Sequence, residues 1–226
     1  MTTTSKPFPH RSLACAFALC ALATVVLLSD HPGGGGHTFT EVLQSEARNQ
    51  VTDAVVHGGF ILISAVLMVC LARLSRVLET SKVAVTTGFV AFCVGAGALM
   101  MSMGLDGLVL PAIAARSLSE NTPASLASAQ TLLLFCGTCI KFLMPIGLLF
   151  ESAAMMSFSI AMLARRWFWV GGLGIAAGIA LLSGPLLLSG FGAGLSIGGI
   201  LALCLWYLAI AVRLWLERPQ STETPA

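Results

Sequence analysis

Long apolar runs alternate with short polar segments along the whole chain. Most charged residues gather in segments up to residue 11, around 30–53, 73–82, 116–120 and 165–166, and from 213 onward, and the exceptions are Asp106, Lys141 and Glu151. A helix needs about 20 apolar residues to cross a hydrocarbon core of about 30 Å, and most runs between the charged segments approach or exceed that length. The pattern predicts an all-α membrane protein.

The apolar runs predict a bundle of six transmembrane helices within residues 13–218, flanked by cytoplasmic tails at 1–12 and 219–226. The spans are expected at about residues 13–28, 51–74, 83–103, 127–164, 167–188 and 195–216. The first run has the basic start of a signal peptide, with Lys6 and Arg11 before it, but no small-residue cleavage site precedes its polar end. We therefore expect a retained helix, whereas cleavage would leave five spans.

Residues 125–164 form a long run without a clear turn signal. Forty helical residues would measure about 60 Å, twice the core thickness. The run is either one long helix kinked at Pro145 or two short spans joined by a hairpin there. Since no polar residue stands next to Pro145, we favour one long helix.

Some of the six spans are expected to extend on the outer side into a small helical cap, and the outer linker and cap include residues 30–50. Four glycines, residues 33–36, end the first helix, and Thr40 followed by Glu41 is typical of a helix start. The helix over residues 83–103 is expected to continue to about Ala115. Residues 116–123 have the composition of a loop.

Composition and charge agree with a membrane location. The chain is 57% hydrophobic and 10% charged, whereas soluble domains carry about 25% charged residues. Six spans place nine lysines and arginines on one side, and only Arg48 and Arg116 on the other. This bias predicts cytoplasmic termini in a bacterial inner membrane, with the lipid bilayer as partner. A net charge of +2 without a basic aromatic patch argues against nucleic-acid binding.

Four ionisable residues on three predicted spans reach one level near the outer edge of the core. Asp53 and His57 lie 21 and 17 residues from Leu74 at the inner end of their span, or ~31 and ~25 Å at the rise of a helix. Asp106 and Lys141 each lie 23 residues from the inner end of theirs. Because ionisable groups in membrane helices face the bundle interior or a wet cavity, we expect an outward-facing pocket with an Asp106–Lys141 ion pair.

A polar stripe on the second span supports this pocket. Glu46, Gln50, Asp53 and His57 follow helical spacing, and the opposite face is largely apolar. Asp53 and His57, one turn apart, could share a proton, orient the imidazole or ligate a metal. In the structural alternative, these polar groups only fix helix packing.

Glu151 is expected close to the middle of the membrane. It lies 13 residues from Ala164, which corresponds to ~20 Å along a helix. A carboxyl group there either transfers protons or remains neutral and forms hydrogen bonds across helices.

The seven cysteines all lie in predicted spans, so they do not form the disulfide framework of a secreted domain. Cys136 and Cys139 form a C-x-x-C at the outer end of a span. In this feature the chain resembles quinone-linked disulfide-generating membrane proteins, and the resemblance implies redox chemistry. It covers four residues and fails elsewhere, because those proteins need a second cysteine pair in an outer loop. We expect Cys136 and Cys139 not to form a catalytic disulfide.

Histidines supply the candidate metal ligands. His31 and His37 flank the glycine run, and together with His57 they could gather three imidazoles, which suit copper and zinc, at the outer face. The alternative is a flexible tether. No haem, nucleotide, metalloprotease or serine-hydrolase motif occurs, so the cofactor stays open and an enzyme is not favoured.

The last two spans are rich in glycine. Gly174 with Gly178, and Gly194 with Gly198, form faces of small residues that allow helix backbones to approach closely. We expect these faces to pack within the chain, and a homodimer is the alternative.

The leading functional expectation is a non-enzymatic membrane protein whose outward-facing pocket binds or passes a small ligand or ion. The pocket residues are Asp53, His57, Asp106 and Lys141, with Glu151 below them. The second expectation is a redox or metal-handling protein that uses Cys136, Cys139 and the outer histidines. The third is a structural or accessory subunit.

Overall fold

The computed structural model describes residues 10–31, 36–78, 82–187 and 193–217, without the side chains of residues 183–196. The described elements are the helices α1 (His10–Ser29), α2 (Phe39–Val77), α3 (Lys82–Gly104), the π-helical turn η1 (Leu105–Val109), α4 (Leu110–Glu120), α5 (Pro123–Ala164), α6 (Phe168–Leu187) and α7 (Ala193–Leu216). These residues contain no β-strand. Most of the expected amino-terminal tail, the whole of the carboxyl-terminal one, glycines 33–35 and most of the loop after α6 lie outside them.

Five described helices are long and apolar enough to cross a membrane, which indicates an integral membrane protein. They are α1, α2, the continuous α3–η1–α4 unit, α5, and α7 over Ile197–Leu216. The described part of α6 is a shorter apolar helix, Phe168–Leu182. Large apolar side chains such as Leu62, Leu134 and Phe142 are about two-thirds exposed, as expected of surfaces that contact lipid rather than water.

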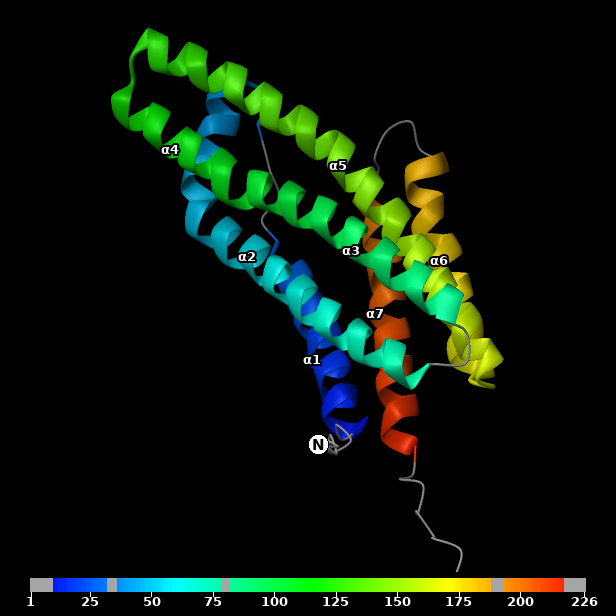
Figure 1. Cartoon of the computed structure of the whole chain (residues 1–226). Coiled ribbons are helices and arrows are strands. Elements are labelled where there is room, and N and C mark those ends of the chain that lie inside the picture. Colours follow the sequence, from blue (N-terminus) through cyan, green and yellow to red (C-terminus); the bar gives the residue numbers. More distant parts are fainter. Residues whose placement is uncertain (1–9, 32–35, 79–81, 188–192, 218–226) are drawn as a thin grey trace, which may run out of the picture.

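Successive helices run up and down, and three of them extend beyond the others. Figure 1 shows α4 and the adjoining ends of α2 and α5 as an arm that projects away from α6 and α7. We call this arm the cap, and its small core consists of Leu43, Ala114 and Ala129. The main core lies in the remaining bundle, where α3 packs on α5, α5 on α6, and α1 on α7.

Helix α2 starts two residues before the start expected from the sequence. Thr38, not Thr40, is the N-cap of α2, and it forms a capping box with Glu41. The backbone N–H groups of His37 and Thr38 both donate to the Glu41 carboxylate, at 2.7 and 3.1 Å. These bonds satisfy donors that the first turn of a helix leaves unpaired.

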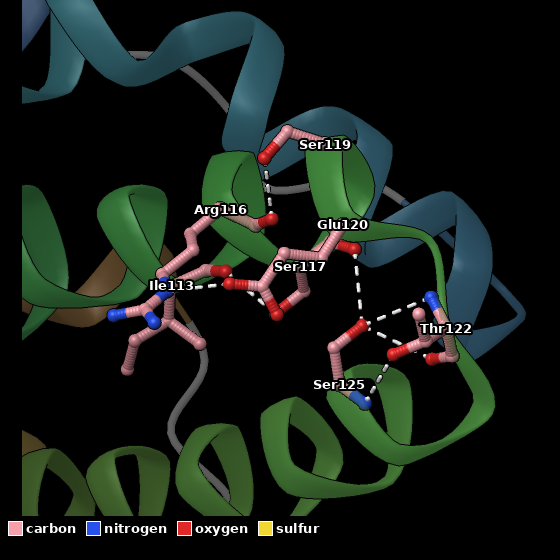
Figure 2. Close-up of polar contacts among 7 residues, drawn as sticks. All are labelled: Ile113, Arg116, Ser117, Ser119, Glu120, Thr122 and Ser125. Atoms are coloured by element: carbon pink, nitrogen blue, oxygen red, sulfur yellow. Dashed lines mark hydrogen bonds and ion pairs between the residues drawn. The ribbon is translucent and has the colours of Figure 1, made fainter.

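The loop expected at residues 116–123 is mostly helix, which corrects the sequence interpretation. Helix α4 continues to Glu120, and the turn consists of Asn121 and Thr122. Figure 2 shows the polar contacts within this helical segment: Arg116 pairs with Glu120 one turn later at 2.8 Å, and the hydroxyls of Ser117 and Ser119 donate to carbonyls of the preceding turn. Asn121 adopts a left-handed conformation (φ 44°), which ends the helix.

Thr122 then starts α5 as its N-cap, in a capping box with Ser125. Helix α5 contains 42 residues, or ~63 Å of helix. The helix is not interrupted at Pro145. Residues 125–164 therefore form one long helix and not two short spans joined by a hairpin.

Several glycines lie where two helices of the chain pack closely against each other. On α6, a Cβ added at Gly174 would lie 2.1 Å from Ser159 Oγ, and one at Gly178 would lie 2.9 Å from Met156 Cγ. This face of α6 therefore packs on α5. A Cβ at Gly198 of α7 would meet nothing within 4 Å, and the surroundings of Gly194 lie outside the described side chains. The homodimer stays a prediction.

Helices α3 and α5 are in close contact at Gly95. A Cβ there would lie 2.9 Å from both the backbone nitrogen of Glu151 and the carbonyl oxygen of Gly147. Because these are backbone atoms, the two helices would have to separate to admit a methyl group.

Gly95→Ala is therefore expected to lower the free energy of unfolding by about 1–3 kcal/mol, the usual cost of overpacking. Gly97→Ala is the matched control, since its added Cβ would meet nothing within 4 Å, and it should be neutral or stabilising by up to about 1 kcal/mol. Thermal unfolding of both variants in mild detergent measures the difference. Equal stability of the two variants would contradict the close backbone contact between α3 and α5 at Gly95.

Candidate metal centre

Helix α2 holds His57 in a fixed orientation at the base of the cap. The His57 side chain is 4% exposed, and its Nδ1 lies 2.9 Å from the backbone carbonyl oxygen of Asp53, one turn earlier. A carbonyl oxygen can only accept, so Nδ1 carries the proton in this bond. The other ring nitrogen, Nε2, is thereby oriented away from α2. Metal-binding histidines are commonly anchored by such a bond.

A π-helical turn places Asp106 opposite this nitrogen. The backbone N–H of Leu110 donates to the carbonyl of Leu105, five residues back, and Pro111 follows at once. Proline has no N–H for the carbonyl four residues before it, so ordinary helical bonding is interrupted here. Such π-turns are often found at functional sites. The Asp106 carboxylate Oδ2 lies 3.2 Å from His57 Nε2.

Gly107 lets the imidazole lie directly against this turn. A Cβ at Gly107 would come within 2.3 Å of His57 Cβ and Cγ, and within 2.5 Å of Nδ1. Any larger residue would displace the ring. The π-turn therefore supplies both a carboxylate for His57 and the space that the imidazole occupies.

The segment that follows α1 contributes a second imidazole. The His31 ring lies edge-on to the His57 ring, with 4.9 Å between ring centroids. One donor atom each from His31, His57 and Asp106 lies within 4.8 Å of the other two. Ligands of a tetrahedral zinc ion, at bonds of about 2.0–2.1 Å, lie about 3.3 Å apart. The His57–Asp106 pair already has that spacing and the His31 donor lies within 4.8 Å of both, so the three residues form a candidate metal site.

Two more carboxyl groups surround these donors. Asp53 is 7% exposed, and both Asp53 and Glu46 interact electrostatically with His57 and Asp106. The polar stripe expected on α2 thus reaches the site at three of its four positions, while Gln50 is exposed. This concentration of acidic groups favours a cation.

The structure does not bring Lys141 to Asp106. Among the ion pairs of the described residues, Asp106 pairs with His57, and Lys141 lies on an exposed face of α5. The sequence predicted that Lys141 lies at the same depth in the membrane as Asp106, but the Lys141 side chain is on the exposed face of α5. The ion pair inferred from sequence depth is therefore replaced by an imidazole–carboxylate pair.

Glu151 belongs to another part of the bundle. It is 7% exposed and packs against α3, where an added Cβ at Gly95 would lie 3.1 Å from its Cγ. It is not in the group of donors that converge at His57. A role in proton transfer stays a prediction.

The remaining sequence candidates lie apart from the metal group. His37, whose backbone N–H donates to Glu41, is exposed, and its ring is not among the converging donors. Cys136 is buried and Cys139 is half-buried, and both are free thiols. The structure thus gathers two of the three predicted histidines, with Asp106 as the third donor.

Sequence reasoning missed Gly107 and the irregular turn around it. The signal was an Asp-Gly dipeptide at 106–107 with Pro111 close behind, inside an otherwise apolar helical run. Together they mark a local break in regular helical bonding. No comparable local feature of the sequence indicated that His31 would lie close to His57.

Searches against protein-family models, curated proteins and solved structures find no match to this chain.

A double-mutant cycle is expected to show coupling between His57 and Asp106 but not between Lys141 and Asp106. His57→Gln and Asp106→Asn each remove one partner of a close pair, so their combined loss of stability should be smaller than the sum. Asp106→Asn with Lys141→Met should be additive within about 0.5 kcal/mol, as for separated residues. Thermal unfolding in detergent provides the four stabilities of each cycle. Coupling in the lysine cycle and additivity in the histidine cycle would contradict the geometry.

Proposed function

We propose that this protein is a membrane protein that binds a divalent transition-metal ion at His31, His57 and Asp106. The observation that carries the proposal is the convergence of two imidazoles and one carboxylate around His57, whose Nδ1 is anchored and whose Nε2 faces Asp106 at 3.2 Å. The donors come from three chain segments: the residues after α1, helix α2 and the turn η1. This is the ion-binding form of the outward-facing pocket expected from the sequence.

The donor set determines which ions fit. Imidazole ligands suit zinc, copper, nickel and iron, whereas calcium and magnesium prefer oxygen ligands. Three protein ligands also leave at least one coordination position open for water or a bound molecule. His31 is exposed, and the Asp106 side chain is 38% exposed. The exposure of these two side chains supports direct binding of a metal ion from the aqueous side.

We further propose six spans with both termini in the cytoplasm of a bacterium, so that the cap and the metal site face outward. The up-and-down order of the helices supports this arrangement (Figure 1). The cap carries Arg48 and Arg116, while the other end of the bundle carries a concentration of basic residues. Positively charged residues favour the cytoplasmic side of inner-membrane proteins.

Reporter fusions test the topology. Fusions after residues 28, 120 and 190 should report a periplasmic position, and fusions after residues 81 and 166 and at the carboxyl end a cytoplasmic one, because the spans alternate in direction. Paired alkaline phosphatase and fluorescent protein reporters give opposite signals at each site. A periplasmic carboxyl end would contradict the six-span topology.

Metal binding is tested with full-length protein in detergent, titrated with Zn²⁺ and with Cu²⁺ by calorimetry. His57→Ala and His31→Ala should each weaken binding by more than about 100-fold, because loss of a supporting second-shell partner alone costs about 10–100-fold. His37→Ala is the matched control: it removes an imidazole from the same segment, but outside the converging group, and should bind as the wild type does.

A second pair of variants separates ligand loss from misfolding. Gly107→Ala changes no ligand residue but displaces the His57 ring, so it should weaken binding while helicity stays unchanged. Gly104→Ala, whose added Cβ meets nothing within 4 Å, should not. Equal affinity of the wild type and the His57→Ala variant would overturn the proposal.

A further inference from the structure

A groove lies between α2 and α3 at the end of α2 opposite the cap. Its volume is about 300 Å³, and its lining residues are Met68, Val69, Ala72, Arg73, Arg76 and Phe89. The lining is apolar toward the middle of α2 and basic toward its carboxyl end. None of the lining residues within the described part of the chain is acidic.

The groove continues a stripe of exposed apolar residues along the same face of α2. Leu62, Val66 and Val69 are 66%, 38% and 62% exposed, and with Arg73 and Arg76 they follow helical spacing of four and three residues. Residues 62 to 73 span ~16 Å of helix, close to one leaflet of a hydrocarbon core of about 30 Å. The stripe therefore has the length of a leaflet and one charged end.

The charged end has the chemistry of a phosphate site. Arg73 and Arg76 are both exposed and lie one turn apart near the end of α2. A guanidinium group binds phosphate oxygens through paired N–H donors. Arg165 of α5 donates a hydrogen bond to the carbonyl oxygen of Val77, so the end of α2 that carries these arginines is held to the bundle.

We propose that this groove binds an anionic phospholipid. Its phosphate lies on Arg73 and Arg76, and an acyl chain lies in the groove against Phe89 and along the apolar stripe. The two arginines complement the negative headgroup, and the apolar residues complement the chain, in the order in which a lipid of one leaflet presents them. Basic pockets between membrane helices are known sites for anionic headgroups. The site is independent of the metal site, which lies at the base of the cap.

Spin-label spectroscopy tests the proposal with the full chain reconstituted in phosphatidylcholine vesicles. Trace phosphatidylglycerol or phosphatidylcholine, each labelled on an acyl chain, reports the fraction of lipid immobilised by the protein. We expect the wild type to prefer phosphatidylglycerol by about fivefold or more, the contribution of about one arginine near a headgroup. Arg73→Gln with Arg76→Gln should reduce the preference to below about twofold.

Arg48→Gln with Arg116→Gln is the matched control, because it removes two exposed arginines at the cap end. It should retain the wild-type preference. The double variant Arg73→Lys with Arg76→Lys keeps both positive charges and should retain part of the preference for phosphatidylglycerol. That result would show that the glutamine variant loses the preference through loss of charge and not through misfolding. An unchanged preference in the glutamine pair would overturn the proposal.

Two further arms identify the occupant. Ala72→Phe fills the groove without changing its charge and should lower the preference at least twofold, whereas an unchanged preference would overturn the acyl-chain part of the proposal. Inorganic phosphate, compared with chloride at equal ionic strength, should not displace the labelled lipid. Specific displacement by phosphate would assign the arginines to a soluble anion and overturn the lipid assignment.

Discussion

The hydrocarbon core of a membrane offers backbone groups no water, so a chain that crosses it has to satisfy its own hydrogen bonds, and helices do so within one segment. This constraint explains why the described residues are almost entirely helical. Regular helical bonding changes at the π-helical turn η1. At η1 the chain keeps a bond from Leu110 to Leu105, but the π-turn redirects Asp106 and presents Gly107 to His57. Both the carboxylate that pairs with His57 and the glycine that its ring lies against belong to this irregular turn.

Much of the fold could be predicted from the sequence, because spacing and hydropathy act locally. The long α5 and the continuation of α2 into the cap follow from runs without turn signals. The polar segment 116–123 misled prediction, because its composition is typical of a loop while the Arg116–Glu120 pair and the serine-to-carbonyl bonds support a helix. The composition of a segment does not show which ion pairs and hydrogen bonds its side chains form within it.

The site could be predicted only in part, because depth along a helix does not determine which way a side chain points. Asp106 and Lys141 were expected at one level, but rotation about α5 decides the outcome, and Lys141 is exposed. The His57–Asp106 pair depends on the π-turn, and His31 reaches the pair through the segment after α1. With the lipid groove near its other end, α2 combines a proposed ion site with a proposed lipid anchor on one continuous helix.

X-ray absorption spectroscopy of the zinc-loaded protein tests the central claim most directly, because it reports which atoms surround the ion. Ligation by His31, His57 and Asp106 predicts a first shell of nitrogen and oxygen at about 2.0–2.2 Å, with the outer-shell scattering of two imidazoles. A sulfur shell at about 2.3 Å would instead indicate cysteine ligands and would contradict the account.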